Sequence, residues 1–263
     1  MAYTIQYAYV SAMGKVRLNH EDNFWCEGKY LPEQNEGTDG IVTGSLPGNA
    51  FCGAAVLDGM GGECCGETAA FLGAKKFGEY LENYRPGFFF RDPEAYIRDL
   101  TLSMNKTVTE NADENKIMSM GSTVVLAVFT RWWIHLANLG DSRIYVMSRE
   151  GFRQVSRDHV LRSYAFGKAP LVQYLGMEDD EDTHPEPTVV SLHPEHDMQI
   201  LLCTDGLTDM VPDPEIEKIL NEEKDVSAAV EKLLNTALEN GGRDNTTIWL
   251  GKIKRQGVTW LPF

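Results

Sequence analysis

The chain has no long hydrophobic run. None of its apolar stretches approaches the roughly 20 consecutive residues that a membrane-spanning helix needs. The opening residues also lack a basic segment followed by an apolar one, which is the pattern of a secretory signal peptide. These two absences predict a cytoplasmic protein with no membrane partner.

Cysteine is scarce, and its spacing carries no metal-binding pattern. The chain has 5 cysteines, and no two of them are separated by two residues as in zinc sites. An odd number of cysteines without such spacing disfavours both a disulfide framework and a thiolate metal site. We therefore expect free thiols.

Positive charge is also in short supply. The 263 residues include 24 Lys and Arg against 39 Asp and Glu, a formal net charge of −15. This balance argues against nucleic acid or an anionic membrane as the main partner. No internal repeat, linker or shift in composition marks a boundary, so we expect residues 1–263 to form a single domain.

Blocks of β-branched and aromatic runs alternate with blocks of helical periodicity, without a strict strand–helix–strand rhythm. We predict strands over 3–14, 22–31, 50–57, 197–205 and 245–253, of which the first two are candidates for a hairpin. An antiparallel meander is predicted over 122–156 and includes Trp132 and Trp133. The segments 32–49 and 157–196 are predicted to be a loop and an irregular stretch. Helices are predicted over 66–84, 92–115 (with Asp92 as N-cap and Pro93 at the first helical position), 212–223 and 226–242. The pattern favours an α+β fold of antiparallel sheets packed against helix layers.

Acidic residues recur at the ends of the predicted apolar strands. They lie in the segments "VRLNHEDNF", "AVLDGMGG", "ANLGDSRIYV", "LLCTDGL" and "GGRDNTT". The acids concerned are Glu21, Asp22, Asp58, Asp141, Asp205 and Asp244. Each one alone is most simply a residue that caps the local backbone.

Together, these acids suggest a cation site. Carboxylates gathered at one mouth of a sheet repel one another, so at least one must bind a proton or share a cation. Oxygen ligands without a nearby Cys or His set favour Mg²⁺ or Mn²⁺ over Zn²⁺. Gly59, Gly61 and Gly62, which follow Asp58, let the backbone approach such a site closely, and the Gly59 carbonyl could itself bind a metal ion.

The ordered set "VRLNHEDNF", "LDGMGG", "GSTVVLAVF", "NLGDSRIYV", "LLCTDGL" and "GGRDNTT" resembles the metal-dependent protein phosphatases of the PPM family, the type 2C Ser/Thr phosphatases. The resemblance covers nearly the whole chain, and "DGMGG" is more similar to bacterial members than to animal ones. It implies a four-layer α-β-β-α sandwich, with two antiparallel sheets flanked by antiparallel helices. It also implies phosphorylated protein substrates and a cognate Ser/Thr kinase.

The resemblance implies a role for each matching residue. Asp58 would bridge two Mn²⁺ or Mg²⁺ ions, with the Gly59 carbonyl on one of them. Asp205 and Asp244 would complete the ligands of the first ion. A hydroxide held between the ions would attack phosphorus directly, without a covalent phosphoenzyme, so the cysteines would not be nucleophiles.

The remaining matches would support this pair of ions. Asp22 and Glu21 would hold metal-bound waters, Glu21 from outside the ligand set. Asp141 would help to hold a third, weaker ion. Arg17 would bind the substrate phosphate, and Asn245 would support the loop that carries the neighbouring acid.

Three residues depart from the family pattern. Glu63 stands where a bacterial member would have histidine, and we expect it to be a solvated acid at a helix N-terminus, with a contact to an outer water of the site as the alternative. Met60 stands where many eukaryotic members have a histidine proposed as the general acid, and methionine cannot donate a proton. His20 replaces an expected asparagine. We expect His20 to cap its turn, although a hydrogen bond to the acidic cluster is the alternative.

The segment that corresponds to the family's flap is short, around 157–178. A shortened flap removes surface that would contact a phosphoprotein, which leaves a small-metabolite phosphatase as one alternative. A catalytically inactive scaffold or regulator with the same fold is the other. Because Asp58, Asp205 and Asp244 are all present, the sequence favours the active phosphatase.

Overall fold

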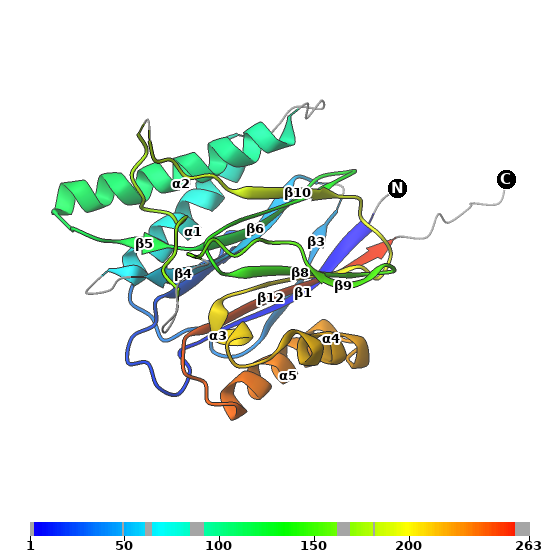
Figure 1. Ribbon diagram of the computed structural model, residues 1–263. Coiled ribbons are helices and arrows are strands. Elements are labelled where there is room, and N and C mark those ends of the chain that lie inside the picture. Colours follow the sequence, from blue (N-terminus) through cyan, green and yellow to red (C-terminus); the bar gives the residue numbers. More distant parts are fainter. Residues whose placement is uncertain are drawn as a thin grey trace.

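Two antiparallel β-sheets lie face to face, and helices cover both outer faces (Figure 1). The structure is a computed structural model that describes residues 3–48, 50–60, 65–84, 92–161, 169–180 and 182–255. The four layers confirm the predicted α+β sandwich. None of the helices in these ranges is both long and apolar enough to span a membrane.

Sheet A has six strands in the order β3-β1-β12-β11-β8-β9. They are β1 Tyr3–Ala12, β3 Val42–Pro47, β8 Arg143–Ser148, β9 Gly151–Gln154, β11 Gln199–Cys203 and β12 Thr246–Arg255. Sheet B has the order β10-β7-β6-β4-β2, and the short β5 pairs with β4. Its strands are β2 Asp22–Cys26, β4 Cys52–Met60, β5 Gly121–Ser122, β6 Val124–Phe129, β7 Ile134–Leu139 and β10 Thr188–Leu192.

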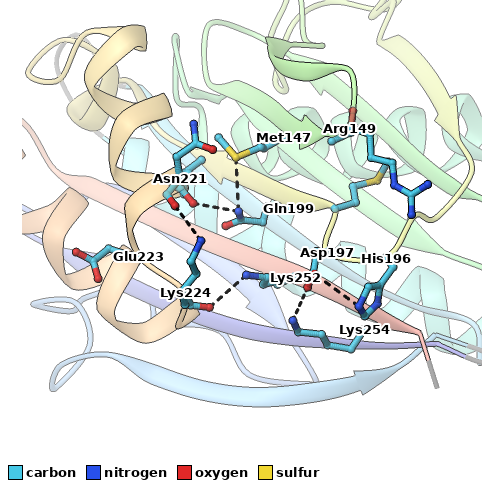
Figure 2. A pocket seen from close by; sticks show the side chains of 13 residues that line it. Met147, Arg149, His196, Asp197, Gln199, Asn221, Glu223, Lys224, Lys252 and Lys254 are labelled. Carbon is cyan, nitrogen blue, oxygen red and sulfur yellow. Dashed lines mark hydrogen bonds and ion pairs between the residues drawn. The ribbon is translucent and has the colours of Figure 1, made fainter. Parts of the chain in front are cut away.

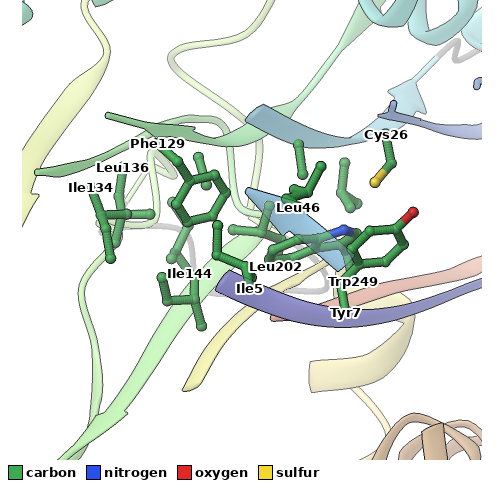
Figure 3. Close-up of a cluster of buried hydrophobic side chains, with 14 of the residues drawn as sticks. Ile5, Tyr7, Cys26, Leu46, Phe129, Ile134, Leu136, Ile144, Leu202 and Trp249 are labelled. Carbon is green, nitrogen blue, oxygen red and sulfur yellow. The ribbon is translucent and has the colours of Figure 1, made fainter. Parts of the chain in front are cut away.

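Strand alternation divides the apolar side chains among three cores. In β4, Ala54 and Val56 point between the sheets, whereas Ala55 and Leu57 point towards the helices over sheet B. The core between the sheets also contains Trp249 of β12 (Figure 3). Each sheet therefore buries both faces, which explains why its central strands are apolar on both sides.

The helices form a pair on each outer face. Helix α1 Gly66–Asn83 and helix α2 Pro93–Asn115 pack on sheet B, while α4 Asp213–Glu222 and α5 Val226–Glu239 pack on sheet A. A single short helix, α3 Asp205–Thr208, follows β11. The predicted start of α2 is confirmed: the Asp92 side chain accepts a hydrogen bond from the Ala95 amide at 3.0 Å, and Pro93 is the first helical residue.

Several local predictions were wrong because the chain changes sheets. The predicted hairpin of the first two strands does not form, since β1 pairs with β12 and β3 in sheet A while β2 pairs with β4 in sheet B. The meander is likewise divided, with β6 and β7 in sheet B and β8 and β9 in sheet A. Neither crossing between sheets leaves a signal in the alternation of a single strand.

Two edge strands were also missed. Strand β3 lies within the predicted loop over 32–49, and β10 lies within the predicted irregular stretch over 157–196. Each pairs with one strand only, at the edge of its sheet, so a partly exposed sequence with Gly and Pro is tolerated in β3.

Trp132 and Trp133 do not lie in a strand. They belong to the turn between β6 and β7, where the Thr130 side chain accepts from the Trp133 amide at 3.1 Å. Both side chains are exposed, at 55% and 40%, so neither belongs to the core. The four cysteines within the described ranges are free, as expected, and Cys64 lies outside those ranges.

The core between the sheets should dominate stability. Phe129 is fully buried there, with its ring centroid 6.1 Å from that of Trp249 (Figure 3). We expect Phe129→Ala to lower the free energy of unfolding by about 3–5 kcal/mol in urea denaturation, because the cavity cannot close between two sheets. The control Met118→Ala, at a fully exposed side chain, should change it by less than about 0.5 kcal/mol. Equal effects of the two substitutions would contradict this packing.

Candidate metal centre

Two of the predicted acids face each other across neighbouring strands. Asp22, the first residue of β2, is the register partner of Asp58 in the antiparallel pair with β4. Side chains at directly opposite positions share one face of a sheet, with Cβ atoms roughly 4.5–5.5 Å apart. Folding thus brings together two carboxylates that are far apart in the sequence.

Asp22 is the most buried member of the acid set, with 1% of its surface exposed. Its Oδ2 accepts hydrogen bonds from the hydroxyls of Thr204 at 2.9 Å and Thr247 at 2.7 Å. Its Oδ1 is buried and accepts no hydrogen bond from any residue that the structure describes. Burial raises the pKa of Asp22 well above its usual range, the charge of Asp58 raises it further, and the two hydroxyls oppose the rise.

Asp205 and Asp244 approach Asp22 and Asp58 from sheet A. We call the end of the two sheets where these four acids lie the rim. Asp205 is buried and begins α3, with one residue between it and the end of β11. Asp244 is separated from the start of β12 by Asn245 alone. Asp244 forms an ion pair with Arg17, whose Nη2 lies 2.7 Å from Oδ2. That hydrogen bond raises the pKa of Arg17, and the charges of Glu21 and Asp58 act in the same direction.

The loop between β1 and β2 carries Arg17 and Glu21, and Asn245 holds it in place. The Asn245 side chain accepts from the Glu21 amide at 2.8 Å and donates to the carbonyls of Met13 at 2.9 Å and Asn19 at 3.0 Å. Asn245 therefore ties this loop to the start of β12. Its contact with its acidic neighbour is made by the backbone, since the Asn245 amide donates to Asp244 Oδ1 at 2.9 Å.

Gly59 lies in a space that only glycine fits. Its amide donates to the Glu21 carbonyl at 3.1 Å, and a Cβ there would lie 2.2 Å from the Gly66 carbonyl oxygen. This close approach joins β4 to the first residue of α1. Gly61 and Gly62, which sequence reasoning placed beside the site, lie outside the described residues, and so does Glu63.

Asp141 lies in the tight connection where the chain crosses from β7 to β8. The residue after it is linked to the acid pair. The Ser142 hydroxyl lies 2.7 Å from the Thr123 hydroxyl, which accepts from the Asp58 amide at 3.1 Å. On the other side, the Gly140 amide donates to His159 Nδ1 at 3.1 Å, so His159 supports this connection.

Hydroxyl side chains are the functional residues that sequence reasoning missed. Thr204, Thr247 and Thr123 hydrogen-bond to the acids or their backbone, yet threonine in a strand is an ordinary β-former. Their only signal was their position beside the acids in "CTDG", "DNTT" and "GSTVV".

His20 does not cap an exposed turn as we expected. It is buried, with Nε2 3.2 Å from the Ser11 hydroxyl, which lies 2.6 Å from the hydroxyl of Thr247. His20 is therefore connected to Asp22 through two hydroxyls, which is close to the alternative of a hydrogen bond to the acids. Burial lowers its pKa to about 4, so the ring is neutral at neutral pH.

The donor set suits a hard divalent cation. A buried carboxylate oxygen without a hydrogen bond, facing a second carboxylate, is a position that a cation would stabilise. Within the described ranges, no three His, Cys, Asp or Glu side chains form a ready-made metal group. Mg²⁺ does not require one, because it keeps several waters and is usually held by one or two carboxylates.

The chain is similar to known protein phosphatases. Residues 33–251 match the family described as Protein phosphatase 2C. The chain is 30% identical over 212 residues to the serine/threonine phosphatase stp of Listeria monocytogenes, covering 74% of this chain and 82% of that protein. It is 25% identical over 259 residues to the serine/threonine protein phosphatase PstP of Mycobacterium tuberculosis, covering 93% of this chain but 44% of that longer protein.

A solved structure shares the fold. The catalytic domain of the phosphatase PstP, crystallised in complex with two manganese ions, superposes with a TM-score of 0.73 at 23% identity, over 96% of this chain and 100% of that one. This likeness confirms the four-layer architecture.

The buried Asp22 carboxyl should lower the stability of the metal-free protein. Because folding raises its pKa, the free energy of unfolding should fall as the pH rises above the usual aspartate value of about 3.9. Asp22→Asn keeps an acceptor for the threonine hydroxyls and removes the charge. In urea denaturation with EDTA at pH 7, we expect this variant to be more stable than the wild type, with the difference shrinking towards pH 4.

The exposed Asp179→Asn serves as the matched control and should leave stability unchanged. An Asp22→Asn variant that is less stable than the wild type at pH 7 would show that the carboxylate is already neutralised within the protein.

Proposed function

The chain belongs to the protein phosphatase 2C family, and on that premise we propose that it is a metal-dependent phosphatase that hydrolyses phosphoserine and phosphothreonine in proteins. The observation that carries the proposal is the buried, incompletely hydrogen-bonded Asp22 carboxyl opposite Asp58. A protein that kept only the fold would gain stability by replacing such a pair with apolar residues. Retaining both acids therefore favours an active enzyme over a scaffold.

We assign the acids to a pair of Mn²⁺ or Mg²⁺ ions. The proposed ligands are Asp58, the Gly59 carbonyl, Asp205 and Asp244, with Asp22 and Glu21 holding waters around them and Asp141 contributing to a third ion. When bound, such ions lower the pKa of water and neutralise charge on phosphoryl oxygens. The family relationship and the oxygen-rich donor set support this assignment.

Arg17 is the proposed binding residue for the substrate phosphate. Its guanidinium has five N–H donors, and the hydrogen bond to Asp244 uses one of them. The side chain is half-exposed at the rim, so its outer edge can meet a phosphate from solvent. Asn245 keeps the Arg17 loop against β12 and thereby fixes where the phosphate would bind.

Neither Met60 nor His20 can supply a proton to the leaving oxygen. Met60 carries no acidic proton, and the buried ring of His20 is neutral at the pH of the cytoplasm. We propose that a water in the site protonates the leaving alkoxide. The rate should then lack the pH dependence of a histidine acid near its usual pKa of about 6.5.

We also propose a cellular setting. Phosphoserine and phosphothreonine arise by phosphoryl transfer, so the enzyme would oppose a cognate Ser/Thr kinase. Such a kinase uses ATP, which would place both enzymes in the cytoplasm. Residues 1–263 would act as a single phosphatase domain with a shortened flap around 157–178. Within that segment, residues 162–168 lie outside the described ranges.

The proposed metal ligands can be tested with p-nitrophenyl phosphate. Hydrolysis should require Mn²⁺, stop with EDTA and return with excess Mn²⁺. Asp58→Asn and Asp205→Asn should each lower kcat/KM by a factor on the order of 10² or more, because charge at the reacting phosphoryl group is no longer neutralised. The control Asp179→Asn should keep the wild-type rate. Undiminished hydrolysis by Asp58→Asn, or by wild type in EDTA, would contradict the assignment.

The substrate class needs a separate comparison. With Mn²⁺ present, we expect kcat/KM for a phosphothreonine peptide to exceed that for each member of a panel of phosphorylated metabolites. Arg17→Met should raise KM for the peptide more than it lowers kcat, since Arg17 binds the phosphate in the ground state. A metabolite that is the better substrate would favour the small-molecule phosphatase instead.

A further inference from the structure

A second polar site lies at the opposite end of sheet A from the acids. It is a cavity of about 400 Å³, lined by residues of β8, β11, β12 and the turn between α4 and α5 (Figure 2). Lys252 in this cavity is eight residues from Asp244 along β12, which corresponds to about 26 Å at roughly 3.3 Å per residue. The cavity is therefore separate from the candidate metal centre.

Hydrogen bonds fix the floor and one wall of the cavity. Lys252 and Gln199 are register partners on neighbouring strands and point to the same face of sheet A. The Gln199 side chain donates through Nε2 to the Leu220 carbonyl at 3.1 Å, and the Lys252 ammonium donates to the Lys224 carbonyl at 3.2 Å (Figure 2). The strands and the end of α4 thus hold the cavity open in a defined shape.

Two carboxylates line the cavity, and both already have cationic partners. Asp197 is hydrogen-bonded to Lys254 and lies 3.5 Å from the ring of His196 (Figure 2). Glu223 lies 3.2 Å from the ammonium of Lys232 on α5. Both acids thus form their ion pairs with cations other than Arg149, Lys224 and Lys252.

Three cations remain without a carboxylate partner among the residues that the structure describes. They are Arg149, Lys224 and Lys252, and all three line the cavity. Lys224 contacts a neutral carbonyl, that of Asn221, at 3.4 Å. In a chain with a net charge of −15, such a group of uncompensated positive charges is a local exception.

Lys252 is the clearest sign that the cavity has a ligand. It is 8% exposed, and lysines so buried are nearly always paired with an anion. Its ammonium instead donates to a neutral carbonyl. Burial lowers the pKa of Lys252 and the nearby charge of Lys254 lowers it further, while the charges of Asp197 and Asp225 oppose the shift only in part. An anion in the cavity would therefore reduce the cost of keeping Lys252 charged.

We propose that this cavity binds a small soluble anion that carries a phosphate group, either inorganic phosphate or a phosphate monoester. Three cations without carboxylate partners match a dianion with three terminal oxygens better than a single carboxylate. The cavity is within the usual size of small-molecule sites. The net charge of −15 disfavours an anionic membrane as the source of the phosphate.

The test measures binding rather than activity. The whole chain is held in EDTA, so that metal ions at the other site cannot bind the probe. It is titrated calorimetrically with inorganic phosphate, with glycerol 3-phosphate and with phosphatidic acid vesicles. We expect saturable binding of both soluble probes at one site per chain. Lys252→Met, which keeps the length of the side chain without its charge, should weaken it by a factor on the order of ten or more.

The variants keep the result interpretable. Arg149 and Lys224 are exposed, so Arg149→Met and Lys224→Met should weaken binding without affecting folding. Lys106→Met on α2 removes the same charge far from the cavity and should bind as the wild type does. If Lys252→Met fails to fold, the two exposed variants still decide the proposal.

Three outcomes would overturn the proposal: no saturable binding of either soluble probe, equal affinity in the Arg149→Met, Lys224→Met and Lys106→Met variants, or binding only to phosphatidic acid vesicles. Because EDTA is present throughout, failure of this test would leave the proposed phosphatase reaction untouched. Conversely, an inactive protein could still bind phosphate in this cavity.

Discussion

Repulsion between carboxylates is the constraint on which the rest of the rim depends. Asp22 and Asp58 are register partners, and Asp22 is buried with one oxygen that no described residue satisfies. Folding alone does not stabilise this arrangement, because the buried carboxylate loses its contact with water and lies beside a group of like charge. The two threonine hydroxyls on Asp22 and the guanidinium of Arg17 on Asp244 compensate only in part. On the proposed assignment, a divalent cation would complete the compensation, so that metal binding would also stabilise the acids at this end of the sheets.

The fold brings these acids together because the chain changes sheets at the rim. Among its several crossings between the sheets, the chain passes from sheet A to sheet B between β1 and β2, and from sheet B to sheet A between β7 and β8. These crossings carry Arg17 and Asp141 to the end where β4, β11 and β12 bring their acids. Asn245 then joins the first crossing to β12. The three apolar cores hold both sheets rigid, so the acids cannot move apart to reduce their repulsion.

Much of this architecture could be predicted from local sequence, but contacts between distant segments could not. The N-cap at Asp92 and the apolar strands near 50–57 and 245–253 follow from neighbouring residues, and the structure confirms them as the start of α2, β4 and β12. Pairing of β1 with β12 joins the two ends of the chain, which periodicity does not encode. The acids were recognisable because they form an ordered set. Thr204, Thr247 and the buried Lys252 were not, since a threonine or lysine in a strand has no distinctive signal until its partners are known.

The most direct test is anomalous diffraction at the manganese edge from crystals grown with Mn²⁺. We expect two strong anomalous peaks between Asp58, Asp205 and Asp244, with Asp22 facing them. Anomalous density elsewhere on the surface, with these carboxylates turned away from one another and no ion between them, would contradict the paired-cation site.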